Sequence, residues 1–402
     1  MPLSLYLHIP FCSTRCSYCD FNTYAGLEDR IPAYVEALAL ELRRVAAALR
    51  DADTQGDGLS THTVFFGGGT PSLLPVESIR RLLATIGEMF DLTPDAETSL
   101  EANPGTVSPA YLAELRDAGV NRLSLGAQSA ALPELALLGR NHSFDDVAEA
   151  VGHARAAGFQ NVSLDLIFGL PDQTVESWQD TMEKALALGT EHLSLYALSL
   201  EFGTPLRSWV TRGLVPAPDP DLAADMYEAA VRRLKESGYI QYEISNWALP
   251  RPDSEGGVES TTYACRHNLQ YWRNLPYLGL GAGAHGCALG WRYANVRSPE
   301  AYIRAVTSEH RSDFAIAPAA VTKERVLGRT EMGETMLLGL RLTEEGVPEG
   351  GFARRFGIGL AAAYGAELRR FQDVGLVEWD TVGVRLTPRG RLVGNLVFEA
   401  FV

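Results

Sequence analysis

Hydrophobic and polar residues follow two different periods along the first half of the chain. Short runs rich in β-branched and aromatic residues predict strands at 3–9, 63–66, 98–102, 122–127, 161–168 and 192–198. Between these runs, apolar residues recur every three or four positions, which predicts helices at 31–50, 76–90, 108–119, 143–158 and 174–189. Strands that alternate with helices are typical of βαβ units in a parallel sheet.

The repeated units predict an α/β fold whose first domain, residues 1–215, is an open, partial (β/α)6 barrel. A doubly wound sheet is the alternative arrangement of the same units. The Pro- and Asp-rich stretch VPAPDPD at 215–221 predicts a linker. We expect it to open a second segment, 216–312, and an α+β region with a winged-helix-like end to follow at 313–402.

Composition narrows the class of protein. The chain has 402 residues, a net charge of −15 and five cysteines. An acidic balance argues against a nucleic-acid partner, and no apolar run is long enough to predict a membrane span. The N-terminal residues resemble a core strand rather than a signal peptide. We therefore expect a cytoplasmic protein in a reducing compartment.

Three of the five cysteines are crowded into the stretch FCSTRCSYCDF. Cys12, Cys16 and Cys19 have the spacing C-x3-C-x2-C. Thiolates are soft ligands for zinc or iron–sulfur clusters. A structural zinc site normally needs a fourth ligand from the protein, and no fourth cysteine is nearby in the sequence. The spacing therefore favours a [4Fe–4S] cluster with one iron left open, with a zinc site completed from afar as the alternative.

With its flanking residues, YLHIPFC and YCDF, this motif resembles the signature of the radical S-adenosylmethionine (SAM) superfamily. More specifically, it is similar to the coproporphyrinogen dehydrogenase-like group, HemN and HemW, over most of the chain. The resemblance implies that the open iron binds SAM, that the barrel is TIM-like and that the C-terminal region is HemN-like. It also implies an electron donor such as a flavodoxin or a ferredoxin.

The resemblance assigns SAM contacts to polar and glycine residues after the predicted strands. FFGGGTP supplies Gly67, Gly68, Gly69 and Thr70 for the methionine part of SAM. Because chemistry in such barrels lies at the carboxyl ends of the strands, the remaining expected contacts are placed there or beside the cysteines. They are Tyr6, Tyr18, Glu101, Gln128, Arg140, Asp165 and Ala197.

Two features separate the branches of this group. Phe21 stands where the cysteine run of coproporphyrinogen dehydrogenases has a further cysteine, and the first predicted strand begins at about residue 3, whereas those enzymes carry an extension before it. The stretch HNLQYW, 267–272, instead resembles the hallmark of the heme-chaperone branch. An imidazole is a good axial ligand for heme iron, so His267 is the expected ligand, with Cys265 and His285 as weaker candidates.

The branch assignment predicts a heme chaperone that passes heme to an acceptor protein whose identity the sequence does not name. Oxygen-independent oxidative decarboxylation of coproporphyrinogen III is the alternative activity. A related radical SAM methyltransferase or cyclopropanase is the third, and HNLQYW favours the chaperone over both.

Overall fold

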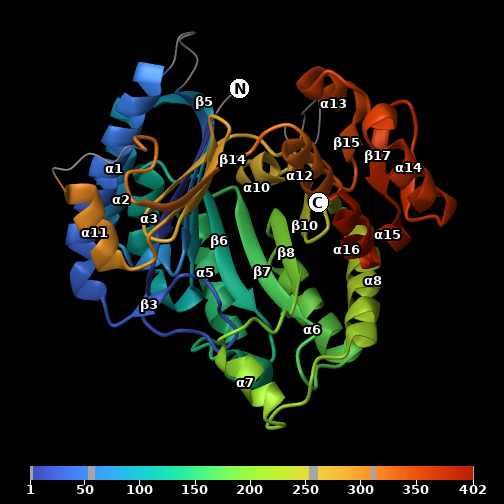
Figure 1. Cartoon of the computed structure of the whole chain (residues 1–402). Coiled ribbons are helices and arrows are strands. Elements are labelled where there is room, and N and C mark those ends of the chain that lie inside the picture. The colour runs from blue at the N-terminus through green and yellow to red at the C-terminus, as the bar shows by residue number, and fades with distance from the viewer. Residues whose placement is uncertain (1–2, 53–58, 253–260, 309–313, 402) are drawn as a thin grey trace. The chain divides into compact units, whose positions relative to one another are not determined.

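A computed structural model describes residues 3–52, 59–252, 261–308 and 314–401 (Figure 1). Its contacts divide the chain into two compact units. The first comprises Met1–Arg232 with Pro276–Glu324, and the second comprises Arg233–Leu275 with Arg325–Val402. The chain thus leaves the first unit and returns to it within the segment predicted as 216–312. The functional assignment of the three predicted segments stays a prediction.

Six parallel strands form the centre of the first unit, in the order in which they occur in the chain. They are β1 (Leu3–Ile9), β4 (Ser60–Gly68), β5 (Asp91–Ala102), β6 (Arg122–Gln128), β7 (Val162–Phe168) and β8 (His192–Ala197). Each strand pairs in parallel with the next, for example with Leu5 opposite Val64 and Leu125 opposite Leu164. The predicted α/β fold with a partial barrel is therefore confirmed, and each predicted strand coincides with an observed one.

The connecting helices also match their predicted positions. They are α1 (Ile31–Ala52), α2 (Val76–Met89), α3 (Pro109–Asp117), α5 (Phe144–Ala156) and α6 (Val175–Ala187), and Figure 1 shows α1 to α3 outside the strands. Ser108 and Ser143 cap α3 and α5 by accepting hydrogen bonds from backbone N–H groups of the first turn. No helix in the described segments is both long and apolar enough to cross a membrane.

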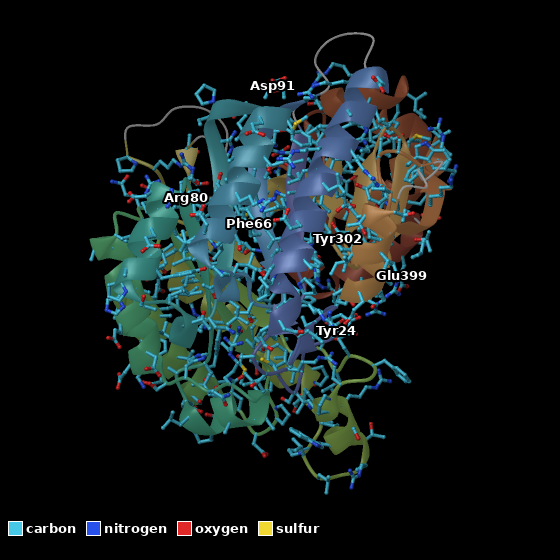
Figure 2. The ribbon with its side chains drawn as sticks, turned by 90° about the vertical axis from the view of Figure 1, so that its left-hand side faces the viewer. Tyr24, Phe66, Arg80, Asp91, Tyr302 and Glu399 are labelled. Carbon is cyan, nitrogen blue, oxygen red and sulfur yellow. The ribbon has the colours of Figure 1, made fainter. Side chains whose placement is uncertain are left out.

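The sheet of the first unit extends beyond β1, which the sequence did not indicate. Strand β11 (Tyr277–Leu280) pairs with β1 in parallel, with Leu5 opposite Leu278. Three further strands, β12 (His285–Ala288), β13 (Trp291–Asn295) and β14 (Ala320–Arg325), continue it outward. Helix α11 (Pro299–Thr307) then packs against α1, with Tyr302 near their junction in Figure 2. A distant part of the chain is thereby joined to the barrel beside its first strand.

A buried carboxylate fastens this added segment to α1. Glu41 is fully buried and accepts hydrogen bonds from the Gly281 N–H (2.8 Å), the Asn295 amide (3.1 Å) and the Tyr302 hydroxyl (2.6 Å). Burial raises the pKa of Glu41 to about 7. The three donors satisfy the carboxyl group in a site where an unpaired polar group would be costly.

The second unit is a smaller α+β body. It contains the hairpin β9 (Ile240–Glu243) and β10 (Asn246–Ala248), and the helix α10 (Arg266–Trp272). A three-stranded sheet follows, with α12 (Arg329–Gly339), α13 (Glu349–Phe356) and α14 (Leu360–Asp373) supplying core residues such as Phe352 and Leu368. The predicted α+β C-terminal region is confirmed: β16 (Val377–Trp379) and β17 (Gly383–Leu386) are the two strands around a turn, and the short helices α15 (Pro388–Leu392) and α16 (Gly394–Phe398) follow them.

Replacing Glu41 by alanine is expected to destabilise the first unit. The substitution leaves three buried donors without their acceptor, so we expect the free energy of unfolding to fall by about 2–4 kcal/mol. Glu36→Ala, on the same helix but in an exposed pair with Arg81, is the control and should cost at most about 1 kcal/mol. Chemical denaturation followed by circular dichroism measures both, and equal losses would contradict the account.

The same residue predicts a pH dependence of stability. Because the pKa of Glu41 is about 7 in the folded chain and 4.5 in the ordinary state, the folded chain binds the extra proton. The resulting stabilisation is complete below the ordinary pKa and is lost as the pH rises through the folded pKa. Wild-type stability should therefore fall between about pH 5 and about pH 8 more steeply than that of Glu41→Gln, which cannot ionise.

Candidate cofactor site

The carboxyl ends of the central strands surround a cavity of about 360 Å³, a size suited to a small organic ligand. Its wall combines the cysteine-bearing loop with the ends of β4 to β8. Of the residues expected at a cofactor, it includes Cys12, Cys16, Cys19, Tyr18, Gly68, Gly69, Thr70, Glu101, Gln128, Arg140, Asp165 and Ala197. Side chains that are far apart in the sequence thus share one cavity.

Residues 10–25, here called the cluster loop, carry the three cysteines and have little regular structure. Two-residue strands, β2 (Phe11–Cys12) and β3 (Tyr24–Ala25), pair near its two ends. In the middle, Ser17 donates from its backbone N–H and its hydroxyl to the carbonyls of Leu138 and Leu137 in α4 (Leu132–Leu138). Contacts with other elements therefore determine the path of this loop.

The donor set fits an iron–sulfur cluster. All three cysteines are free thiols, and all three face the same cavity. Within the described residues, no three His, Cys, Asp or Glu side chains are gathered as ligands of a single metal ion. Each thiolate of a [4Fe–4S] cluster binds a different iron, so three thiols around one cavity suit a cluster whose fourth iron is open. We infer that Cys12, Cys16 and Cys19 would hold it.

The glycine motif after β4 packs directly against the cluster loop. The backbone N–H groups of Gly69 and Thr70 donate to the carbonyls of Ile9 and Phe11, each at 2.8 Å. A Cβ at Gly69 would lie 2.6 Å from the Phe11 carbonyl oxygen and 3.0 Å from the Cys12 sulfur, so any side chain would push the loop away. The Thr70 hydroxyl also reaches that sulfur, at 3.6 Å. The motif thereby positions Cys12.

Two half-buried carboxyl groups lie in the cavity wall. Glu101, at the end of β5, accepts a hydrogen bond from the Gly68 N–H at 3.0 Å, and Asp165 accepts from the Ser124 hydroxyl at 3.1 Å. Burial, with a smaller effect of Asp165, raises the pKa of Glu101 to about 7, and burial also raises the pKa of Asp165. Asp165 lies within β7 rather than at its end. A cationic ligand or hydroxyl donors would stabilise the ionised form of both carboxyl groups.

Arg140 brings a positive charge to the cavity beside Cys16. One of its terminal nitrogens donates to the Asn103 side chain (2.7 Å) and to the Gly126 carbonyl (2.6 Å), and the other lies 3.5 Å from the Cys16 sulfur. Its Nε is buried and has no hydrogen-bond partner in the described part of the chain. An unsatisfied buried donor next to a cavity fits an anionic group of a ligand, such as the carboxylate of SAM.

The remaining expected contacts differ in position. Gln128 ends β6 with a left-handed backbone, φ 65°, where the pairing with β7 shifts register. Ala197 ends β8, and Tyr18 packs against the apolar residues Leu138 and Ile167. Tyr6 and Gly67 are not part of the cavity wall: the Tyr6 hydroxyl bonds His8 Nδ1 at 3.0 Å, and its ring lies against Gly67. Their assignment to SAM stays a prediction.

His267 belongs to the second unit, in α10. It is buried, its Nε2 is 2.9 Å from the Tyr271 hydroxyl, and the two rings meet edge to face. Cys265 is fully buried at the start of the same helix, whereas His285 is exposed in β12 of the first unit. Heme ligation by any of them stays a prediction.

Sequence reasoning missed Asn103, which links two parts of the site. It accepts a hydrogen bond from Arg140 and donates one to Thr70 at 3.3 Å, so it joins the arginine to the glycine motif. It lies directly after β5, two residues beyond Glu101. A polar residue at the carboxyl end of a parallel strand was the available signal.

Comparisons with known proteins agree with this architecture. The model of the radical SAM superfamily matches residues 6–185, and that of the HemN C-terminal domain matches 328–393. The structure of coproporphyrinogen III oxidase HemN from Escherichia coli superposes with a TM-score of 0.81 at 24% sequence identity, covering 100% of this chain and 90% of that one. At this identity the likeness establishes the fold alone. These matches define a radical SAM fold with a HemN-type C-terminal region.

Full-length relatives identify the branch. The chain is 39% identical to the heme chaperone HemW of Mycobacterium tuberculosis, covering 100% of this chain and 95% of the relative. It is 37% identical to HemW of Bacillus subtilis, covering 99% of both chains. The chain therefore belongs to the HemW family of radical SAM proteins. The radical SAM class implies a [4Fe–4S] cluster and SAM as its cofactors.

Glu101 is expected to make SAM binding depend on pH. SAM is cationic, and the ionised carboxylate attracts it more strongly than the neutral acid does. Because the pKa of Glu101 is about 7, the affinity of the cluster-loaded protein should rise several-fold between about pH 6 and about pH 8. Calorimetric titration of Glu101→Gln should show weaker binding without that rise. Glu114→Gln, on the exposed face of α3, is the control, and the same slope in all three proteins would contradict the assignment.

Proposed function

We propose that this protein is a heme chaperone: it binds heme and transfers it to an acceptor protein, with a [4Fe–4S] cluster and SAM in the barrel. The observation that carries this proposal is similarity along the whole chain to relatives named heme chaperones, from Lactococcus lactis as well as the two species above. The acceptor is a protein of unknown identity. We propose a flavodoxin- or ferredoxin-like electron donor for the cluster and a cytoplasmic location.

The barrel is the part of the protein that we propose to bind the cluster and SAM. A bound cluster supplies an electron to SAM in radical chemistry, which is the property of this cofactor pair. The chain's own residues orient and enclose them. Thr70 and Gly69 hold the Cys12 end of the loop, Arg140 offers its buried Nε to an anionic group, and Glu101 offers a carboxyl group to a cationic one.

Helix α10 carries the residues that we propose to bind heme. An imidazole is a common axial ligand of heme iron, and the helix carries a buried His267 next to aromatic side chains of a kind that packs on a macrocycle. In this structure the His267 Nε2 is engaged by the Tyr271 hydroxyl. Ligation through that nitrogen therefore requires the hydrogen bond to break, so Tyr271 competes with heme for His267.

Decarboxylation of coproporphyrinogen III is the alternative that shares this fold. The likeness to HemN supports the architecture and carries no argument for the activity. Phe21, two residues after Cys19, is 64% exposed at the cavity wall in place of a further cysteine. No thiol is available at that position, which favours the chaperone over the dehydrogenase.

Heme binding and decarboxylation can be separated in one experiment. The cluster is reconstituted without oxygen, hemin is titrated by absorption spectroscopy, and coproporphyrinogen III is offered separately with SAM and a reductant. We expect stoichiometric heme binding, transfer to an apo-protein acceptor and no decarboxylation. Consumption of coproporphyrinogen III without heme binding would contradict the proposal.

Tyr271 provides a sharper test of the heme ligand. Tyr271→Phe keeps the aromatic ring but removes the hydroxyl that engages His267, so heme should associate several-fold faster or more tightly. His267→Ala should abolish the absorption band of histidine-ligated heme, both in the wild-type protein and in Tyr271→Phe. Tyr263→Phe, in the same unit, is the matched control. Unchanged heme spectra in His267→Ala would show that another residue is the ligand.

A further inference from the structure

The side chain of Asn22, three residues after Cys19, is engaged at both of its polar atoms. Its Nδ2 donates to the carbonyl oxygens of Ala282 (3.0 Å) and Arg297 (2.9 Å). Its Oδ1 accepts from the Tyr24 hydroxyl at 3.3 Å and faces the Arg297 Nε at 3.4 Å. One amide side chain thus joins the cluster loop to a segment more than 250 positions further along the chain.

The backbone of Asn22 is fastened as well. His8 donates from Nε2 to the Asn22 carbonyl at 2.9 Å. The carbonyl of His8 in turn accepts from the Tyr34 hydroxyl at 2.8 Å, and that hydroxyl accepts from the Ala282 N–H, also at 2.8 Å. A closed set of hydrogen bonds therefore connects β1, α1, the cluster loop and residues 281–284, here called the glycine turn.

The glycine turn fits tightly around Asn22. Gly283 has a φ of +75°, and a Cβ there would lie 2.3 Å from the Asn22 Nδ2. Both the backbone conformation and the contact therefore require glycine. The turn follows β11, which pairs with β1, so its position is determined by the sheet and not by the loop it contacts.

The three cysteines depend on three different parts of the fold. Cys12 is held by Thr70 and the glycine motif, and the residue after Cys16 is held by α4. Cys19 lies three residues before Asn22 on the same loop, and the Asn22 side chain donates to the Ala282 carbonyl of the glycine turn. The glycine turn is thus the anchor of the third cysteine.

We propose that Asn22 and the glycine turn form a clasp that positions Cys19 for the cluster, which makes Asn22 a positioning residue. The proposal rests on the assignment of the three cysteines to a cluster and is independent of heme. Residues that orient metal ligands from outside the ligand set affect metal retention. Removing the contacts of the clasp should therefore weaken retention of the cluster at a point where the stability of the fold is still unchanged.

An asparagine-to-aspartate substitution tests the clasp with almost no change of shape. Asn22→Asp replaces the two N–H donors by oxygen, so a carboxylate faces the carbonyls of Ala282 and Arg297. Asn395→Asp, on the exposed face of α16, makes the same charge change elsewhere and is the control. After anaerobic reconstitution, we expect Asn22→Asp to lose iron to a chelator about 10-fold faster than wild type or more, with an altered electron paramagnetic resonance spectrum.

A second variant approaches the same contact from the other side. Gly283→Ala should give the same fast iron loss, and Gly357→Ala is its control because Gly357 has the same φ of +75° with no atom within 4 Å of a Cβ. Asn22→Ala removes the hydrogen bonds without adding a charge and should act in the same direction. Melting of the apo-proteins separates cluster positioning from folding.

Wild-type iron retention in Asn22→Asp and Gly283→Ala would overturn the clasp. The melting temperatures of the apo-proteins give a second way to overturn it. If Asn22→Asp and Asn22→Ala melt at clearly lower temperatures than Asn395→Asp, and this destabilisation accounts for the iron loss, the clasp is contradicted. Cys16→Ala checks the underlying assignment separately: a full cluster in that variant would remove the basis of the clasp, while the heme proposal would still be judged by heme binding.

Discussion

A loop with almost no regular structure has to hold three thiols around one cavity, and the rest of the site depends on this constraint. Ordering such a loop costs conformational entropy, and its own short strand pairing is too small to offset that cost. Hydrogen bonds from the glycine motif after β4, from α4 and from the glycine turn provide the missing stabilisation. Each of these elements belongs to the first unit, so the sheet transmits its rigidity to the cysteines.

The carboxyl groups and Arg140 complement this arrangement. Glu101 and Asp165 lie half-buried in the same cavity wall, and the negative charge of Asp165 makes Glu101 harder to ionise. Arg140 lies in the same wall beside Cys16, with its Nε unsatisfied among the described residues. A ligand with an ammonium, a carboxylate and hydroxyl groups satisfies all of these groups together, as SAM does. This match supports the proposed contacts between SAM and the polar wall.

The sequence was sufficient for the parallel strands and helices because their hydrophobic periods are regular and their caps conventional, as at Ser108 and Ser143. The sequence also predicted that most of the cavity residues lie close together, since the carboxyl ends of parallel strands meet at one edge of the sheet. It was insufficient for β11, a four-residue strand containing glycine whose partner is β1. Neither the contact of Asn22 with Ala282 nor the orientation of Tyr6 follows from local pattern, because long-range packing determines both.

We infer that the three cysteines hold a cluster whose remaining iron is open to SAM. The most direct measurement is electron paramagnetic resonance of the anaerobically reconstituted, reduced protein, recorded with and without SAM. The account predicts a [4Fe–4S] signal that changes on addition of SAM and is lost in Cys12→Ala, Cys16→Ala and Cys19→Ala proteins. A signal that SAM leaves unchanged, or a complete cluster in any of the three variants, would contradict it.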